Sequence, residues 1–201
     1  MRASAGGGGG ADQVQAALRA VPRAGFLPRA ARRRASYDGP VGIGHGQTNS
    51  QPRTVEAMLR LLEVRPGCRV LDVGSGSGWT TALLGHLTGP HGSVLGLEIV
   101  PELVAFGAAG LVGTGFGWAT IQQADPDVLG CPGQAPFDRI LVSAAAETLP
   151  EELVGQLADG GRLVVPVAGT MLLVVRSGDR RSLTEHGSYR FVPLLTPPPP
   201  G

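Results

Sequence analysis

The sequence predicts an α/β domain of the doubly wound type: a mostly parallel β-sheet with helices on both faces, preceded by a short N-terminal helical arm. Three observations predict this fold. From Arg69 onward, short apolar segments alternate with segments of helical periodicity. The apolar segments are hydrophobic almost throughout, as parallel strands covered on both faces are. The first of them, RVLDV (69–73), runs directly into the glycine-rich turn GSGSG (74–78), a common strand-to-helix connection in such folds.

The first quarter of the chain predicts the arm and an irregular loop. Asp12 is a candidate N-cap for a helix whose apolar face comprises Val14, Ala17, Leu18 and Val21. Pro22 and Pro28 interrupt the chain after this helix, and residues 31–36 (ARRRAS) predict a solvated helical turn. Residues 38–52 contain four glycines and two prolines, so we expect a loop without helical or strand periodicity.

The rest of the chain predicts the sheet and the helices that cover it. Pro52 and Pro101 each suit the first position of a helix, where a missing N–H costs nothing. We expect helices at residues 52–62, 79–87, 101–112 and 150–158, strands at 69–73, 93–98, 118–123, 137–144 and 160–167, and further β-rich segments at 170–177 and 188–195.

Charge and cysteine content exclude several classes of function. The net charge is +1 and all 17 cationic residues are arginine, so we expect no nucleic-acid partner and no membrane partner. Cys68 and Cys131 lie 63 residues apart with no histidine at ligand spacing, so we expect neither a disulfide nor a metal site. Residues 1–10 contain no apolar run, and no segment approaches 18 apolar residues. We therefore expect a cytoplasmic protein.

The turn GSGSG predicts a ligand site at the end of the first core strand. Gly74, Gly76 and Gly78 can adopt positive φ angles and let a ligand approach the backbone closely. Their spacing is G-x-G-x-G, whereas dinucleotide sites use G-x-G-x-x-G to present a helix N-terminus to a pyrophosphate. The pattern favours S-adenosylmethionine over NAD, with the three glycines and Ser75 as candidate cofactor contacts.

Two carboxylates complete the predicted cofactor site. Asp72 lies in the strand just before the turn, where a buried carboxylate needs an ammonium or the N–H groups of the loop as partners. Glu98 ends the next strand, 20 residues after Gly78, where it can accept hydrogen bonds from both hydroxyls of a ribose. We therefore assign both carboxylates to cofactor binding.

The segment IGHGQTNSQP (43–52) lies upstream of the glycine turn and carries an unusual set of amides and hydroxyls. It resembles the G-x-G-Q-T-x-S-x-P block of the protein-L-isoaspartate O-methyltransferase family, with Asn49 at the variable position. The resemblance extends over residues 14–195 and includes these segments: RAVPRAGFLP (19–28), LDVGSGSGW (71–79), LEIVPEL (97–103), the run from Ala135 to Val167, and YRFVPL (189–194).

The resemblance implies methyl transfer from S-adenosylmethionine to the free α-carboxylate of L-isoaspartyl residues in damaged proteins or peptides. Ser50 matches the active-site serine of that family, and Gln47, Thr48 and Arg53 flank it in a substrate loop. An α-carboxylate with a pKa near ~3.5–4 is already ionised at neutral pH, so no general base is required. We therefore expect Ser50 to orient the carboxylate by a hydrogen bond and not to act as a nucleophile, and His45 to be a loop residue.

One motif departs from the family pattern. The family has Gly-Asp-Gly after its third strand, with the aspartate on the adenine amine, where this chain reads QQADPDVLG (122–130). Asp125 is the candidate for that contact, but Pro126 after it has no N–H and restricts its backbone. Two interpretations stay open: Asp125 binds adenine, or it is an ordinary loop residue and backbone groups hold adenine. For Trp79 we favour packing over contact with the cofactor.

We expect a single, monomeric domain over residues 11–195, with the arm and substrate loop at 11–62 and the cofactor-binding core at 63–195. The glycine-rich residues 1–10 and proline-rich residues 196–201 predict disordered tails, because neither can bury enough apolar surface to become ordered. Two alternative functions remain open: a related carboxyl methyltransferase that acts on an aspartate of a biosynthetic peptide, and a non-catalytic cofactor-binding module.

Overall fold

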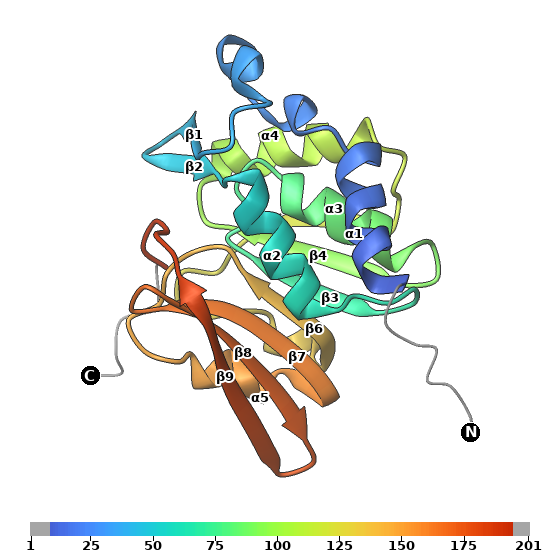
Figure 1. Cartoon of the computed structure of the whole chain (residues 1–201), viewed down its shortest axis with the longest axis vertical. Helices are drawn as coiled ribbons and strands as arrows, with labels where there is room; N and C mark the ends of the chain where they lie inside the picture. The colour runs from blue at the N-terminus through green and yellow to red at the C-terminus, as the bar shows by residue number, and fades with distance from the viewer. Residues whose placement is uncertain (1–8, 195–201) are drawn as a thin grey trace, which may run out of the picture.

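The computed structural model, which describes residues 9–194 and the side chains of 13–194, contains a seven-stranded sheet with the strand order β5-β4-β3-β6-β7-β8-β9. The first five strands in this order are parallel, and β8 and β9 are antiparallel additions at one edge (Figure 1). The strands are β3 (Arg69–Val73), β4 (Ser93–Glu98), β5 (Ala119–Gln123), β6 (Phe137–Val142), β7 (Leu157–Val167), β8 (Thr170–Ser177) and β9 (Arg180–Ser188).

Helices and loops cover the two faces of the sheet, as the fold-class prediction requires. The α-helices are α1 (Gly9–Ala20), α2 (Pro52–Leu62), α3 (Trp79–Thr88), α4 (Pro101–Val112) and α5 (Glu151–Gly155). The first three, with Leu111 of α4, share one core cluster with Val70, Leu141 and Val164 of the sheet. On the other face α5 and the loop around Leu129 pack against Leu71, Ile140 and Leu163. Neighbouring strand residues thus point into opposite cores, which explains why the central strands are mostly apolar.

Connectivity places a crevice at the carboxyl ends of the central strands. The chain runs from β3 outward to β4 and β5, then returns to β6 on the other side of β3. This reversal of strand order between β3 and β6 is the topological switch point, where open α/β sheets bind ligands.

The arm and the loop before α2 differ from the sequence prediction. Helix α1 begins at Gly9, three residues before the predicted cap at Asp12, so Gly9 and Gly10 are helical and not part of a tail. Residues 1–8 of the predicted glycine-rich tail and the predicted proline-rich tail at 196–201 lie outside the described residues. Two 3-10 helices follow, η1 (Arg23–Phe26) and η2 (Arg29–Arg34), and η2 has no buried residue, as the predicted solvated turn requires.

The prediction of an irregular loop at 38–52 is wrong, because this segment contains an antiparallel hairpin. Strand β1 (Val41–Gly44) pairs with β2 (Gln47–Asn49) through the turn at His45, whose φ is +53°. Val41 and Ile43 are buried and the glycines between and after them are exposed, which is a strand alternation of four residues only. The high glycine content concealed so short a pattern.

Three core boundaries also differ. The helix predicted at 150–158 is only α5 (Glu151–Gly155), and β7 takes up the chain from Leu157. The β-rich segment predicted at 188–195 is wrong: β9 occupies Arg180–Ser188 and is polar and almost fully exposed, so no apolar alternation marks it. Residues 192–194 instead lie beside the loop after β6, joined by hydrogen bonds between Ala145 N and Val192 O and between Leu194 N and Ala145 O.

Candidate active site

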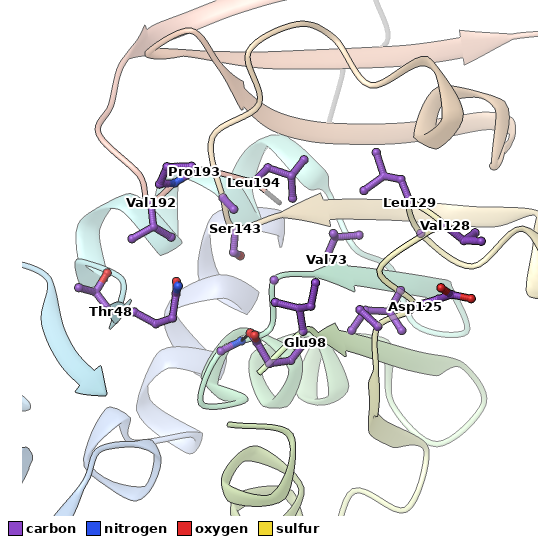
Figure 2. Close-up of a pocket in the computed structure, with 18 residues that line it drawn as sticks. Thr48, Val73, Glu98, Asp125, Val128, Leu129, Ser143, Val192, Pro193 and Leu194 are labelled. Atoms are coloured by element: carbon purple, nitrogen blue, oxygen red, sulfur yellow. Dashed lines mark hydrogen bonds between the residues drawn. The ribbon is translucent and has the colours of Figure 1, made fainter. Parts of the chain in front are cut away.

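A cavity of about 80 Å³ opens at the carboxyl ends of β3, β4 and β6. Figure 2 shows its walls: Thr48 from β2 on one side, Glu98 from β4 below, Ser143 after β6, and the segment 192–194 above. It occupies the topological switch point, where open α/β sheets bind ligands. The polar groups converge on an otherwise apolar space.

Gly74 and Gly76 line this cavity, and their contact with a cofactor stays a prediction. Both have positive φ, +75° and +54°, and the amide of Gly76 donates to Glu98. Gly78 lies elsewhere: it caps α3, and a Cβ there would come within 2.8 Å of Ile121 Cδ1 and 3.1 Å of Gly107 Cα. Gly78 does not line the cavity, so its structural role is the close packing of α3 against α4.

Glu98 is the buried carboxylate of the cavity, at 6% exposure. Its Oε2 accepts from Gly76 N at 2.8 Å, and its Oε1 accepts from Val100 N at 3.0 Å. These two amides fix the orientation of the carboxylate and leave further lone pairs available. A ligand with two adjacent hydroxyls is a suitable partner for them.

Asp72 differs from its predicted geometry. It is fully buried beneath the glycine loop and does not line the cavity. Its Oδ2 accepts from the hydroxyls of Thr80 and Thr81, both at 2.7 Å, while its Oδ1 has no hydrogen-bond partner among the described residues. The loop N–H groups that we expected as partners bind elsewhere: Gly74 N and Ser75 N both donate to Leu97 O. Burial, aided by the nearby negative charge of Glu98, raises the pKa of Asp72 to about 6.

Ser75 lies in the same loop and is also buried. Its hydroxyl has no hydrogen-bond partner among the described residues, and it borders a small cavity next to Ser50 instead of the main one. Buried hydroxyls nearly always have a partner in a native protein. The backbone of Ser75, held by Leu97 O, therefore has a clearer role in shaping the loop than its side chain has in binding.

Asp125 lines the outer wall of the main cavity and is exposed. Its Oδ1 accepts from Asp127 N at 2.9 Å, and in Figure 2 the carboxylate points away from Ser143 and Glu98. The rest of this wall is apolar, formed by Leu97, Ile99, Val128 and Leu129. An aromatic base fits such a wall by apolar contact, whichever group binds its amine.

A second, wider cleft of about 610 Å³ lies beyond Thr48 and Ser143, which line both spaces. Ser50 is half-buried and lines this cleft, and Gln47 lines the main cavity. Arg53 also lines the cleft, but it is 83% exposed and pairs with Asp38 at 3.4 Å. A small cavity borders Ser50, Gly74 and Gly76, and Thr48 and Ser143 line it as they line the two larger spaces. Ser50, the residue predicted to orient the methyl acceptor, and the glycine loop predicted to bind the methyl donor therefore border the same small cavity.

Comparison with known proteins decides the family. A sequence model of the family described as protein-L-isoaspartate(D-aspartate) O-methyltransferase matches residues 6–197. The chain belongs to this family. Among its relatives, the protein-L-isoaspartate O-methyltransferase of Methanopyrus kandleri is 41% identical over 191 residues, which cover 92% of this chain and 84% of that protein. The enzyme of the same name from Aeropyrum pernix is 44% identical over 192 residues, covering 91% and 72% of the two chains.

Solved structures of this methyltransferase family have the same fold. A Plasmodium falciparum protein named in this family and crystallised with S-adenosyl-L-homocysteine superposes with a TM-score of 0.76 at 28% identity, covering 91% of this chain and 90% of that one. Another protein-L-isoaspartate O-methyltransferase gives a TM-score of 0.81 at 23% identity and covers 92% of this chain and 62% of that one, which supports the fold alone. Both agree with the predicted fold.

Two buried residues of this methyltransferase were missed by sequence reasoning. Arg23 and Asn49 are each 5% exposed and hydrogen-bonded to each other, and Asn49 also contacts Ser77 in the glycine loop. The only available signal was the position of Asn49 next to Ser50. Trp79 is buried and donates from Nε1 to Val21 O, which confirms the packing role that we favoured.

The structure also bears on metals and membranes. Among the described residues, no group of three histidine, cysteine or acidic side chains could hold a metal ion. No helix within residues 9–194 has both the length and the apolar character needed to cross a bilayer. Cys68 and Cys131 are both free thiols.

Proposed function

We propose that this protein transfers a methyl group from S-adenosylmethionine to the free α-carboxylate of L-isoaspartyl residues in damaged proteins or peptides. The observation that carries the proposal is the contact between two spaces, a donor cavity with Glu98 and the glycine loop and an acceptor cleft with Ser50. Thr48 and Ser143 line both. Relatives named for this activity span nearly the whole chain, which supports the same assignment.

The donor cavity fits S-adenosylmethionine in three respects. A buried, oriented carboxylate at Glu98 suits a ribose diol, and the apolar wall that includes Leu97 and Leu129 suits adenine. Gly74 and Gly76 allow close approach at the loop. When bound, this cofactor supplies an electrophilic methyl group on a sulfonium. We propose that Glu98, Gly74, Gly76 and, at the outer wall, Asp125 contact it, and that Asp72 and Ser75 act from beneath.

The acceptor side must align an ionised carboxylate with that methyl group. Ser50 has a half-buried hydroxyl and no side-chain hydrogen bond within the described residues, so it can donate to one carboxylate oxygen. A neutral donor orients the oxygen without strongly reducing its nucleophilicity, whereas a paired arginine would. Alignment of two bound reactants can lower a barrier by roughly 7–11 kcal/mol. We propose that Ser50 provides this alignment, with Gln47 and Thr48 around the substrate and Arg53 at the exposed edge of the cleft.

An assay with paired peptides tests this function. The protein is incubated with radiolabelled S-adenosylmethionine and two peptides that differ only in an isoaspartyl or aspartyl linkage. Base-labile methyl ester on the isoaspartyl peptide alone is the expected result. Ester on the aspartyl peptide alone would indicate a carboxyl methyltransferase for a biosynthetic peptide, and label on neither, with the cofactor still bound, would indicate a non-catalytic module.

We further propose that the domain predicted over residues 11–195, extended at its start by Gly9 and Gly10 of α1, acts as a monomer in the cytoplasm on peptides and not on nucleic acid. The near-neutral charge of +1 and the two free thiols support this assignment. Size-exclusion chromatography with light scattering should give a mass near 20.6 kDa, and twice that mass would contradict the monomer.

A further inference from the structure

A chain of buried hydrogen bonds joins Arg23 of the N-terminal arm, Asn49 of strand β2 and Ser77 of the glycine loop. Arg23 Nε donates to Asn49 Oδ1 at 2.7 Å, and Asn49 Nδ2 donates to Ser77 Oγ at 3.0 Å. All three side chains are almost fully buried, with exposures of 5%, 5% and 2%. Breaking either hydrogen bond would leave buried polar groups without partners, which costs free energy. We therefore expect the three residues to keep fixed relative positions.

Arg23 anchors one end of this chain of hydrogen bonds. Besides Asn49 Oδ1, its guanidinium donates at 2.9 Å to the carbonyls of Tyr37, Gly39, Asn49 and Ser50. It forms no salt bridge among the described residues, so these oxygens are what stabilise its buried charge. Burial lowers the pKa of Arg23, with a smaller contribution from Arg34. The backbone around Ser50 is therefore fixed to the arm.

The arm also fixes which way the Asn49 amide faces. Because Arg23 Nε is a donor, the oxygen of Asn49 must face it, and the amide NH₂ must face Ser77. Trp79, the first residue of α3, adds two contacts: Arg23 lies 5.6 Å from the centre of its ring, and its Nε1 donates to Val21 O. The arm thus contacts Asn49 directly through Arg23, and it contacts Trp79, which follows Ser77 by two residues.

Asn49 lies between the residues that face the site. Asn49 of β2 is buried, and together with its neighbours Thr48 and Ser50 it lines the small cavity that also borders the glycine loop. The hydrogen bond from Asn49 to Ser77 is therefore a bridge that links strand β2, next to the proposed acceptor residue Ser50, to the glycine loop. It lies directly beside the small cavity that both segments border.

We propose that Asn49 is a positioning residue that fixes the distance between Ser50 and the glycine loop, and hence between methyl acceptor and methyl donor. The inference rests on the proposed function, because it assigns Ser50 to the acceptor. In a displacement whose catalysis is mainly alignment, a shift of ~1 Å can reduce the rate by about 100-fold. In this proposal Asn49 acts on the distance through its hydrogen bond to Ser77.

Ser77→Ala tests the bridge most cleanly, because it removes the contact to Asn49 and leaves Arg23 and Asn49 paired. We expect kcat for the isoaspartyl peptide to fall by about 10-fold, while the Kd of S-adenosylhomocysteine changes by less than about 3-fold. Ser182→Ala, which deletes a hydroxyl on the exposed strand β9, is the matched control and should leave both unchanged. Equal losses in kcat and cofactor affinity, or no loss in kcat, would overturn the proposal.

Substitutions of Asn49 separate positioning from folding. In Asn49→Asp the carboxylate still accepts from Arg23 and can accept from the Ser77 hydroxyl, so kcat should stay within about 3-fold of wild type. Asn49→Leu removes both contacts and lowers kcat, and adding Ser77→Ala to it should cause no further loss. Independent, multiplying losses would contradict a shared bridge, as would an Asn49→Asp variant as slow as Asn49→Leu.

A readout independent of activity distinguishes this inference from the proposed function. In Ser77→Ala, amide hydrogen exchange of residues 47–50 should accelerate in the presence of S-adenosylhomocysteine, whether or not the peptide is a substrate. Unchanged exchange there would overturn the bridge. An inactive wild-type protein with accelerated exchange in the variant would overturn only the proposed function.

Discussion

Replacement of Asp72 by asparagine should stabilise the protein, and the gain should depend on pH. Burial raises the pKa of Asp72 from 3.8 to about 6. The folded state therefore binds the proton more tightly than the unfolded state, and stability falls as the pH rises from about 4 to 6. A shift of this size corresponds to about 3 kcal/mol at pH 8, where the carboxylate is buried in its charged form. The amide oxygen that Asp72→Asn introduces can still accept from Thr80 and Thr81.

The assay is urea denaturation of the cofactor-free protein at pH 4 and pH 8. For Asp72→Asn we expect an unfolding free energy about 3 kcal/mol above that of wild type at pH 8 and little difference at pH 4. Thr81→Val is the control with the opposite sign, because it removes a donor to the charged oxygen and should destabilise more at pH 8 than at pH 4. A gain of equal size at both pH values, or a loss at pH 8, would refute the reasoning.

A buried charge that destabilises a fold commonly serves binding or catalysis. The Asp72 carboxylate lies under the glycine loop, so we expect it to favour a positively charged ligand above the loop. The same Asp72→Asn variant should therefore bind S-adenosylmethionine more weakly than wild type. Equal affinity by calorimetry would assign Asp72 a structural role only.

Four further substitutions test the site. Glu98→Ala should raise the cofactor Kd by about 10- to 100-fold, since a charge-assisted pair contributes roughly 1.5–3 kcal/mol, and an unchanged Kd in calorimetry would remove Glu98 from the site. Ser50→Ala should lower kcat while leaving the cofactor Kd within about 2-fold, and parallel losses would mean that Ser50 shapes the pocket instead. Gly78→Ala should destabilise by about 1–3 kcal/mol in urea, because its φ is +86° and its Cβ would meet the backbone of Gly107, whereas an unchanged midpoint would show that α4 moves freely. Arg53→Ala should raise the peptide KM by less than about 3-fold because the side chain is exposed and paired, and a rise above about 10-fold would make it a substrate contact.

The sequence predicted the helices and strands that have a regular apolar pattern. It also predicted the candidate site residues that belong to a recurrent strand–turn–helix motif. Strands buried on both faces are recognisable because most of their residues are apolar, and Gly76 and Glu98 are recognisable because a tight turn and a strand-end carboxylate recur at a known interval. The edge strand β9 lacks this pattern, since both of its faces contact solvent. The hairpin before α2 was hidden by its glycines, whose positive φ angles the turn requires.

The site residues that could not be predicted depend on tertiary contacts. Asn49 stands at a position that the motif leaves variable, and its role follows only from the approach of Arg23 and Ser77, which are 26 and 28 residues away in the chain. The partners of Asp72 likewise depend on how α3 returns over its strand. For Gly78, the motif predicts a glycine but not whether a ligand or helix α4 requires it.

A crystal structure with S-adenosylhomocysteine and an isoaspartyl peptide would test the central claim most directly. We predict the sulfur of the cofactor product above Gly74 and Gly76, the ribose on Glu98, and the free α-carboxylate within about 3 Å of Ser50 Oγ. A cofactor bound outside this cavity, or an isoaspartyl carboxylate held by other groups and remote from Ser50, would contradict the account.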